Sequence, residues 1–63
     1  MCLSTIYIDS DGEPEKVMQE VARMEAEGEG FSLIDLFGEK TFIQGKIKSI
    51  DFVDEHSVVI GKT

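Results

Sequence analysis

Turn-forming residues divide this chain into short runs of β-branched and aromatic residues, and that spacing constrains the fold more than any other feature. Runs of this kind, bounded by Gly, Asp and Ser, are typical of strands. The first run is Leu3 to Ile8, and Asp9 to Gly12 have the composition of a turn that ends it. We therefore expect a protein built mainly from β-strands.

The segment from Glu13 to Glu27 has two interpretations. Its composition favours a helix, and Val17, Val21 and Met24 recur at helical spacing. Residues 22–27, however, alternate between apolar and charged, as in a half-exposed strand. We predict a strand for the second half. The first half, up to Glu20, stays open between a helical turn and an extension of that strand.

The rest of the chain continues the same pattern. Phe31 to Phe37, Thr41 to Val53 and Ser57 to Ile60 are three further apolar runs separated by turns. The middle run changes register, and a bend at Gly45 or a bulge near Ser49 would let its isoleucines and Phe52 face one core. About five strands in so short a chain predict a small antiparallel barrel or a highly bent sheet. No internal period was found.

At 63 residues the chain is expected to form one domain, residues 1–63, with a thin core. Chains of this size generally need disulfides, a metal or a partner subunit as an additional source of stability. The single cysteine excludes an intramolecular disulfide. A metal, a second copy of the chain, or both are therefore expected.

The charge is strongly negative. Thirteen acidic and six basic side chains give a net charge of −7, which opposes binding to nucleic acid and to anionic lipid. The first residues contain neither a basic segment nor an apolar run long enough for a signal peptide or a membrane span. We expect a cytoplasmic protein with no membrane contact.

The only cysteine, Cys2, lies one residue from the start of the chain. With Met1 removed, the amine and thiolate of Cys2 could chelate one metal ion. With Met1 retained, the terminal amine, the Cys2 amide nitrogen once deprotonated, and the thiolate could form two fused chelate rings. Nitrogen and sulfur donors favour nickel or copper in tetragonal geometry. In the cleaved form a two-fold dimer would supply two nitrogens and two sulfurs, which suits one square-planar Ni(II) near the axis. The alternative is a buried, inert thiol.

Two other segments were tested as metal sites. With Asp9 as the first position, the acidic turn places carboxylates as a calcium loop does, but Pro14 stands where that loop needs glycine. His56, beside Asp54 and Glu55, could bind a transition metal, although a lone turn histidine is more often solvated. No arrangement of serine, histidine and acid suggests a nucleophile, so we expect no enzyme.

The lysines offer an alternative function. Lys40, Lys46, Lys48 and Lys62 could gather at one sheet edge, and small barrels often bind RNA in this way. The net charge opposes that role, and edge lysines also prevent unwanted strand pairing. An RNA-binding barrel using Lys40, Lys46 and Lys48 is therefore the second hypothesis.

Three stretches resemble the CooT-type nickel-binding proteins: the opening Met-Cys-Leu followed by Ser-Thr-Ile-Tyr, GFSLIDLFGE (Gly30 to Glu39) and GKIKSIDFVD (Gly45 to Asp54). The resemblance spans nearly the whole chain, although Ser4 and Ile34 depart from the expected residues. It implies a small SH3-like barrel that forms a homodimer. It also implies that Cys2 binds Ni(II) and that the protein assists nickel delivery to carbon monoxide dehydrogenase. We expect Cys2 and Met1 to form the metal site.

Overall fold

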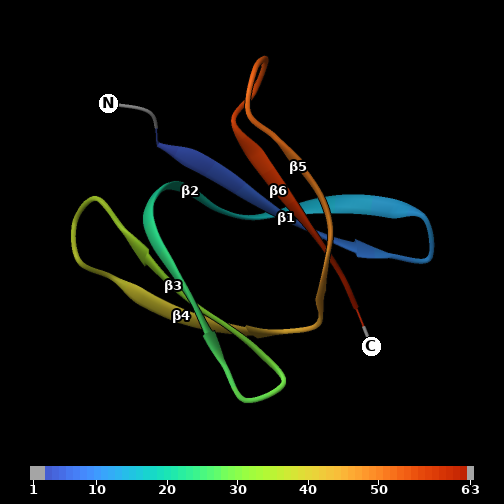
Figure 1. Cartoon of the computed structure of the whole chain (residues 1–63), viewed down its shortest axis with the longest axis horizontal. Helices are drawn as coiled ribbons and strands as arrows, with labels where there is room; N and C mark the ends of the chain where they lie inside the picture. Colours follow the sequence, from blue (N-terminus) through green and yellow to red (C-terminus); the bar gives the residue numbers. More distant parts are fainter. Residues whose placement is uncertain (1–2, 63) are drawn as a thin grey trace.

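The computed structural model describes residues 3–62, and every regular element in them is a β-strand. The strands are β1 (Ser4–Ser10), β2 (Glu13–Glu27), β3 (Gly30–Asp35), β4 (Lys40–Gln44), β5 (Lys46–Asp51) and β6 (Ser57–Gly61) (Figure 1). The expected all-β class is confirmed, with six strands in place of about five. No helix that could cross a membrane occurs in residues 3–62.

The six strands form one strongly curved sheet in the order β4-β3-β2-β1-β6-β5. Four of the five neighbouring pairs are antiparallel, as expected, but β1 and β6 run parallel. These two strands are the first and last of the chain, so no hairpin turn forces them to be antiparallel. Strands β4 and β5 form the two edges, and the sheet does not close between them.

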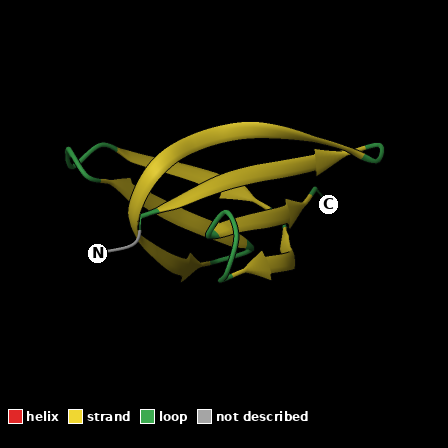
Figure 2. Ribbon diagram, turned by 90° about the horizontal axis from the view of Figure 1, so that it is seen from above, coloured by secondary structure: helices red, strands yellow, loops and turns green. Residues whose placement is uncertain are grey.

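Strand β2 answers the question left open for residues 13–20, because the strand runs from Glu13 to Glu27 and includes no helical turn. Its first part pairs with β1 and its second part with β3, and Val21 is paired on both sides, with Ser4 and with Asp35. The pairing shifts register near this point, and Glu20 has a positive φ of 57°. Figure 2 shows the resulting arch of this strand over the sheet. Hydrogen bonding to two neighbours has overridden the helical propensity of the sequence.

The run from Thr41 to Val53 is two strands, because the chain bends at Gly45. Gly45 has a φ of 151°, and a Cβ atom there would lie 2.4 Å from the carbonyl oxygen of Gly61. Only glycine fits such a corner. The bulge expected near Ser49 is also present, as a register shift between Ile47 and Ser49. Both suggested irregularities therefore occur.

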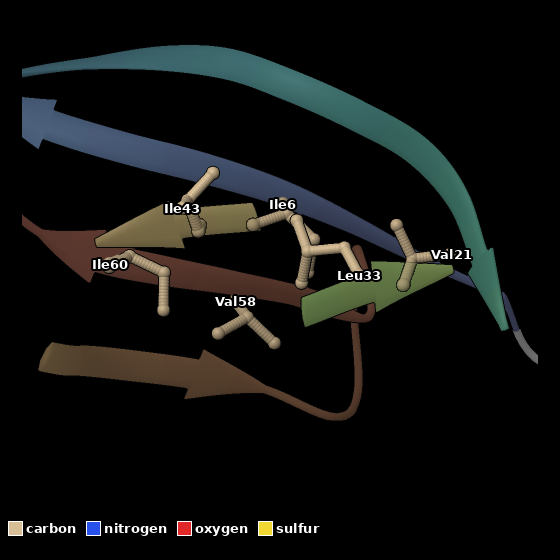
Figure 3. Close-up of a cluster of buried hydrophobic side chains, with 6 residues drawn as sticks. All are labelled: Ile6, Val21, Leu33, Ile43, Val58 and Ile60. Carbon is tan, nitrogen blue, oxygen red and sulfur yellow. The ribbon is translucent and has the colours of Figure 1, made fainter. Parts of the chain in front are cut away.

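The core is small and lies inside the curve of the sheet. It consists of six buried aliphatic side chains: Ile6, Val21, Leu33, Ile43, Val58 and Ile60 (Figure 3). The expectation that Ile47, Ile50 and Phe52 also face this core is wrong, because all three are exposed. Beyond the Gly45 corner, β5 is an edge strand that pairs with β6 alone.

Candidate functional site

The predicted ligands Met1 and Cys2 lie outside the described residues, so the structure locates only the point where the chain enters the sheet. That point is Ser4, the first residue of β1. Ser4 pairs with Val21, and Val21 pairs with Asp35 at the end of β3. The turn from β3 to β4 therefore lies on one side of the start of β1.

A second turn lies on the other side. Thr5 pairs with Ser57 of β6, and Ser57 pairs with Asp51 at the end of β5. The amide of Thr5 also donates a hydrogen bond of 3.1 Å to the carbonyl oxygen of His56. The start of β1 thus lies between the β3–β4 turn and the β5–β6 turn, an arrangement visible in Figure 1.

The β3–β4 turn is organised by the carboxylate of Asp35. Its Oδ1 accepts hydrogen bonds from the amides of Phe37 and Glu39, both at 2.9 Å. The amide of Gly38 donates to the backbone oxygen of Asp35 at 3.0 Å, and Gly38 has a positive φ of 88°. An aspartate that accepts bonds from amides further along the chain is a common way to hold a tight turn.

The β5–β6 turn is built in the same way around Asp51. Its Oδ1 accepts hydrogen bonds from the amides of Val53 at 2.9 Å and Asp54 at 3.0 Å. These two bonds, with a smaller contribution from the charge of His56, lower the pKa of the Asp51 carboxyl. The carboxylate therefore stays ionised and bound to its amides well into the acidic range.

The two turns share a short sequence motif. Residues 34–39 read IDLFGE and residues 50–55 read IDFVDE, so Ile, Asp and Glu recur at equal spacing. The motif is too short to appear as a period, but its aspartate makes the same kind of hydrogen bonds in both places. We call residues 36–39 and 52–55 the turn pair.

Large apolar side chains at the tips of the turn pair are exposed to solvent. The exposed fractions are 52% for Leu36, 79% for Phe37, 75% for Phe52 and 82% for Val53. Four such side chains at one end of a small protein are more than the scattered exposed apolar residues that need no explanation. They indicate a contact surface around the start of β1.

The same end of the sheet is strongly acidic. All five carboxylates of residues 31–63 lie in the two turns or at the aspartates that hold them: Asp35, Glu39, Asp51, Asp54 and Glu55. Neither residues 35–39 nor residues 51–55 contain a lysine or an arginine. Two basic residues lie beside the first turn, since Arg23 and Lys40 both pair with Ile34. The excess of carboxylates over these two residues still favours the approach of cations.

His56 lies directly before β6, with a half-buried side chain and a positive φ of 50°. Its backbone, through the bond to Thr5, anchors the start of β1. The structure therefore places it at the same end of the sheet as the chain start, but shows no ligand role for its imidazole. No group of three or more potential metal-binding side chains occurs in residues 3–62.

The acidic turn tested as a calcium loop is the connection between β1 and β2 at the far end of β1. Asp11 and Gly12 form it with positive φ values, as in a tight hairpin. Oδ2 of Asp9 pairs with the ammonium of Lys48, and Oδ1 of Asp9 is buried, so this carboxylate does not face a cation in the turn. This agrees with the interpretation as a turn and not as a calcium site.

The lysines of the RNA-binding hypothesis are not gathered along one edge of the sheet. Lys40 begins β4 at one edge, whereas Lys46 and Lys48 lie on β5 at the other. Lys48 is also neutralised by its ion pair with Asp9. This distribution does not form the continuous basic groove that tracks a nucleic acid backbone.

A shallow open groove of about 570 Å³ lies away from the turn pair. It is lined by Ala26, Gly28, Glu29, Gly30, Phe31, Gly45, Lys46 and Ile47. Apart from the carboxylate of Glu29 it offers no side chain suited to binding a metal ion. The groove therefore does not compete with the chain start as a metal site.

Comparison with known proteins identifies the family. Residues 1–61 match the family model described as "CO dehydrogenase accessory protein CooT". The chain belongs to the CooT family. Among solved structures, a protein described as a CooT from Carboxydothermus hydrogenoformans superposes with a TM-score of 0.88 at 26% identity, over 98% of each chain. No curated protein sequence matches the chain.

Membership of the CooT family confirms the resemblance drawn from the sequence and gives the protein an accessory role in the maturation of CO dehydrogenase. The family match includes Met1 and Cys2. The structural match covers almost all of both chains, so the curved CooT sheet is common to the two proteins. In this CooT chain, the start of β1 and the turn pair that flanks it form the candidate functional site.

Proposed function

We propose that this CooT protein is a nickel accessory protein, and that it holds Ni(II) through the thiolate of Cys2 for delivery to CO dehydrogenase. The family supplies the link to CO dehydrogenase. Cys2 is the only thiol in the chain, and a thiolate beside a terminal amine offers the sulfur and nitrogen donors that suit Ni(II). The protein carries the metal, acts in the cytoplasm and catalyses no reaction of its own.

The ligand set is completed at the chain terminus and by a second copy. With Met1 retained, its amine and the Cys2 amide nitrogen join the thiolate, the amide nitrogen after losing its proton to solvent. With Met1 removed, the Cys2 amine takes their place. In the cleaved form one chain supplies two donors, and a two-fold related copy supplies the other two for a square-planar site. We therefore expect a homodimer with half a nickel ion per chain.

The residues around the start of β1 support this proposal. Ser4, two residues after Cys2, enters the sheet between two turns that bear all five carboxylates of the second half of the chain. That negative potential raises the local concentration of a divalent cation. The exposed apolar tips beside it give a second copy a surface to bury.

The experiment is a nickel titration of the full chain, followed by thiolate-to-nickel charge-transfer absorption and by native mass spectrometry. We expect an end point at half a nickel ion per chain for the wild type and loss of both absorption and stoichiometric binding for Cys2→Ser. Met24→Leu, which removes a partly buried thioether, is the matched control and should bind as the wild type does. Unchanged absorption in Cys2→Ser would refute the proposed site.

A further inference from the structure

The open groove that lies away from the turn pair has an apolar floor that continues the core. Phe31 pairs with Ile43, and Ile47 pairs with Ile60. Directly paired residues point to the same face of a sheet, and both Ile43 and Ile60 belong to the core. Phe31 and Ile47 therefore extend the core into the groove. Phe31 is nevertheless only partly buried, and Ile47 is 46% exposed.

Two opposite charges line the same groove. Lys46 begins β5, and Glu29 lies in the turn between β2 and β3. Neither side chain forms an ion pair or a hydrogen bond within residues 3–62. Lys48, the next cation on β5, is instead paired with Asp9. The groove therefore presents one ammonium and one carboxylate, each without a partner in the described part of the chain.

We propose that this groove binds an extended segment of a partner protein, and that the segment carries an apolar side chain between an acidic and a basic one. The apolar side chain covers Phe31 and Ile47. The acidic side chain approaches Lys46, and the basic side chain approaches Glu29. Complementary charges of this kind select one partner over another, because a like charge at either position costs free energy. The chain start takes no part in this contact, so the inference does not depend on the proposed nickel site.

The shape of the groove favours a protein segment over a small molecule. Small ligands are usually held in clefts that bury about 70–90% of their surface, whereas this groove is shallow and open. The groove also borders the outer edge of β5, which pairs with β6 alone and can hydrogen-bond to an extended chain. The bulge between Ile47 and Ser49 limits such pairing to the part of β5 beside the groove. A protein partner is also consistent with the accessory role of the CooT family.

The test is fluorescence anisotropy of labelled peptides with the metal-free full chain carrying Cys2→Ser. The probe is the peptide Ser-Val-Glu-Phe-Lys-Val-Ser, for which we expect saturable binding. Replacing its phenylalanine by serine should weaken binding by about tenfold or more, because the apolar floor is then left uncovered. Replacing its two charged residues by glutamine should weaken binding as well. Free phenylalanine should not displace the probe, because it lacks the flanking chain.

Variants of exposed residues locate the surface. Ala26→Phe fills the groove and should abolish binding, whereas Ala22→Phe makes the same change on the same strand outside the groove and should not. Lys46→Glu should weaken binding of the probe by about tenfold, and Lys16→Glu, elsewhere on β2, should leave it unchanged. Because Lys46→Glu leaves two carboxylates in the groove, it should instead prefer the peptide Ser-Val-Lys-Phe-Lys-Val-Ser.

Several results would overturn the inference. Absence of saturable binding by the probe, or equal binding by the peptide without phenylalanine, would show that the groove takes no such segment. Equal losses in Ala26→Phe and Ala22→Phe would place the contact elsewhere, and displacement by free phenylalanine would make the occupant a small molecule. Every measurement uses metal-free Cys2→Ser protein, so failure here leaves the nickel site standing, and normal nickel binding by Cys2→Ser overturns that site alone. Circular dichroism confirms that each variant is folded.

Discussion

At the scale of single residues, one carboxylate oxygen holds each turn beside the chain start. Oδ1 of Asp35 and Oδ1 of Asp51 each accept two backbone hydrogen bonds, and these bonds fix the direction in which the following apolar side chains point. The aspartates are therefore structural, while the carboxylates of Glu39, Asp54 and Glu55 form no hydrogen bond or ion pair within residues 3–62. Substitutions can separate the two roles.

Asp51 provides a pH-dependent prediction. Its pKa is lowered by the bonds from Val53 and Asp54, so it contributes stability that is complete above the ordinary carboxyl pKa of about 3.9 and is lost as the pH falls through the lowered value. Asp51→Ala should lower the unfolding temperature at pH 7 and reduce the loss of stability below pH 4. Asp51→Asn keeps an acceptor oxygen, so it should retain most of the stability at pH 7. Thermal unfolding followed by circular dichroism across that pH range is the measurement. Equal acid sensitivity in Asp51→Ala and wild type would contradict this account.

At the scale of elements, the curvature of the sheet comes from two places where a strand changes direction. Strand β2 exchanges one partner for another at Val21, and the chain turns from β4 into β5 at Gly45. The turn at Gly45 requires a residue without a side chain. A Cβ atom at this position would lie 2.4 Å from the carbonyl oxygen of Gly61 and 2.8 Å from the side chain of Ile60. The corner thus needs both a positive φ and close approach of backbone.

Gly45→Ala should consequently destabilise the fold by about 3 kcal/mol, because it combines backbone strain with overpacking. Gly38→Ala is the matched control. Gly38 also has a positive φ of 88°, but a Cβ there would meet no atom within 4 Å, so only the cost of the backbone conformation remains, about 1 kcal/mol. Urea unfolding of both variants measures the difference. Equal losses would show that the close contact at Gly45 is relieved without cost.

The sequence predicted where the strands of this fold lie along the chain better than it predicted which strands pair with each other. Gly45 and the register change around Ser49 were visible as irregularities, because glycine and a broken alternation leave local signals. The parallel pairing of β1 with β6 left none, since it joins residues about fifty positions apart. The same limit applies to the site. Cys2 stood out as a lone thiol, whereas the turns that flank the chain start became neighbours of β1 only through pairing across the sheet.

At the scale of the whole molecule, the protein is expected to have a small free energy of unfolding. Six buried aliphatic side chains form the core, and a domain of this length is expected to be stable by about 3 to 9 kcal/mol. Any ligand or subunit that binds only the folded state adds to this value. The metal and the second copy therefore bear on folding as well as on function.

Leu33→Ala tests this link. Leu33 is fully buried, and its truncation should cost about 3 kcal/mol, a large share of the total. Ni(II) at about 100 times its dissociation constant should return about 2.7 kcal/mol of this loss. Thermal melts of Leu33→Ala with and without Ni(II) should differ by several degrees, and the same comparison with Cys2→Ser added should show no difference. A nickel effect that persists without the thiol would mean that the cation acts at another place.

The parallel alignment of β1 and β6 has a practical outcome for handling the protein. Because the first strand enters beside Ser57 and the last strand leaves beside Asp9, Lys62 and the start of β1 lie at opposite ends of the sheet. A tether attached beyond Lys62 would therefore leave the turn pair, at the other end of the sheet, facing the solution on a sensor chip. An affinity tag placed before Cys2 would instead mask the amine on which the proposed chelate depends.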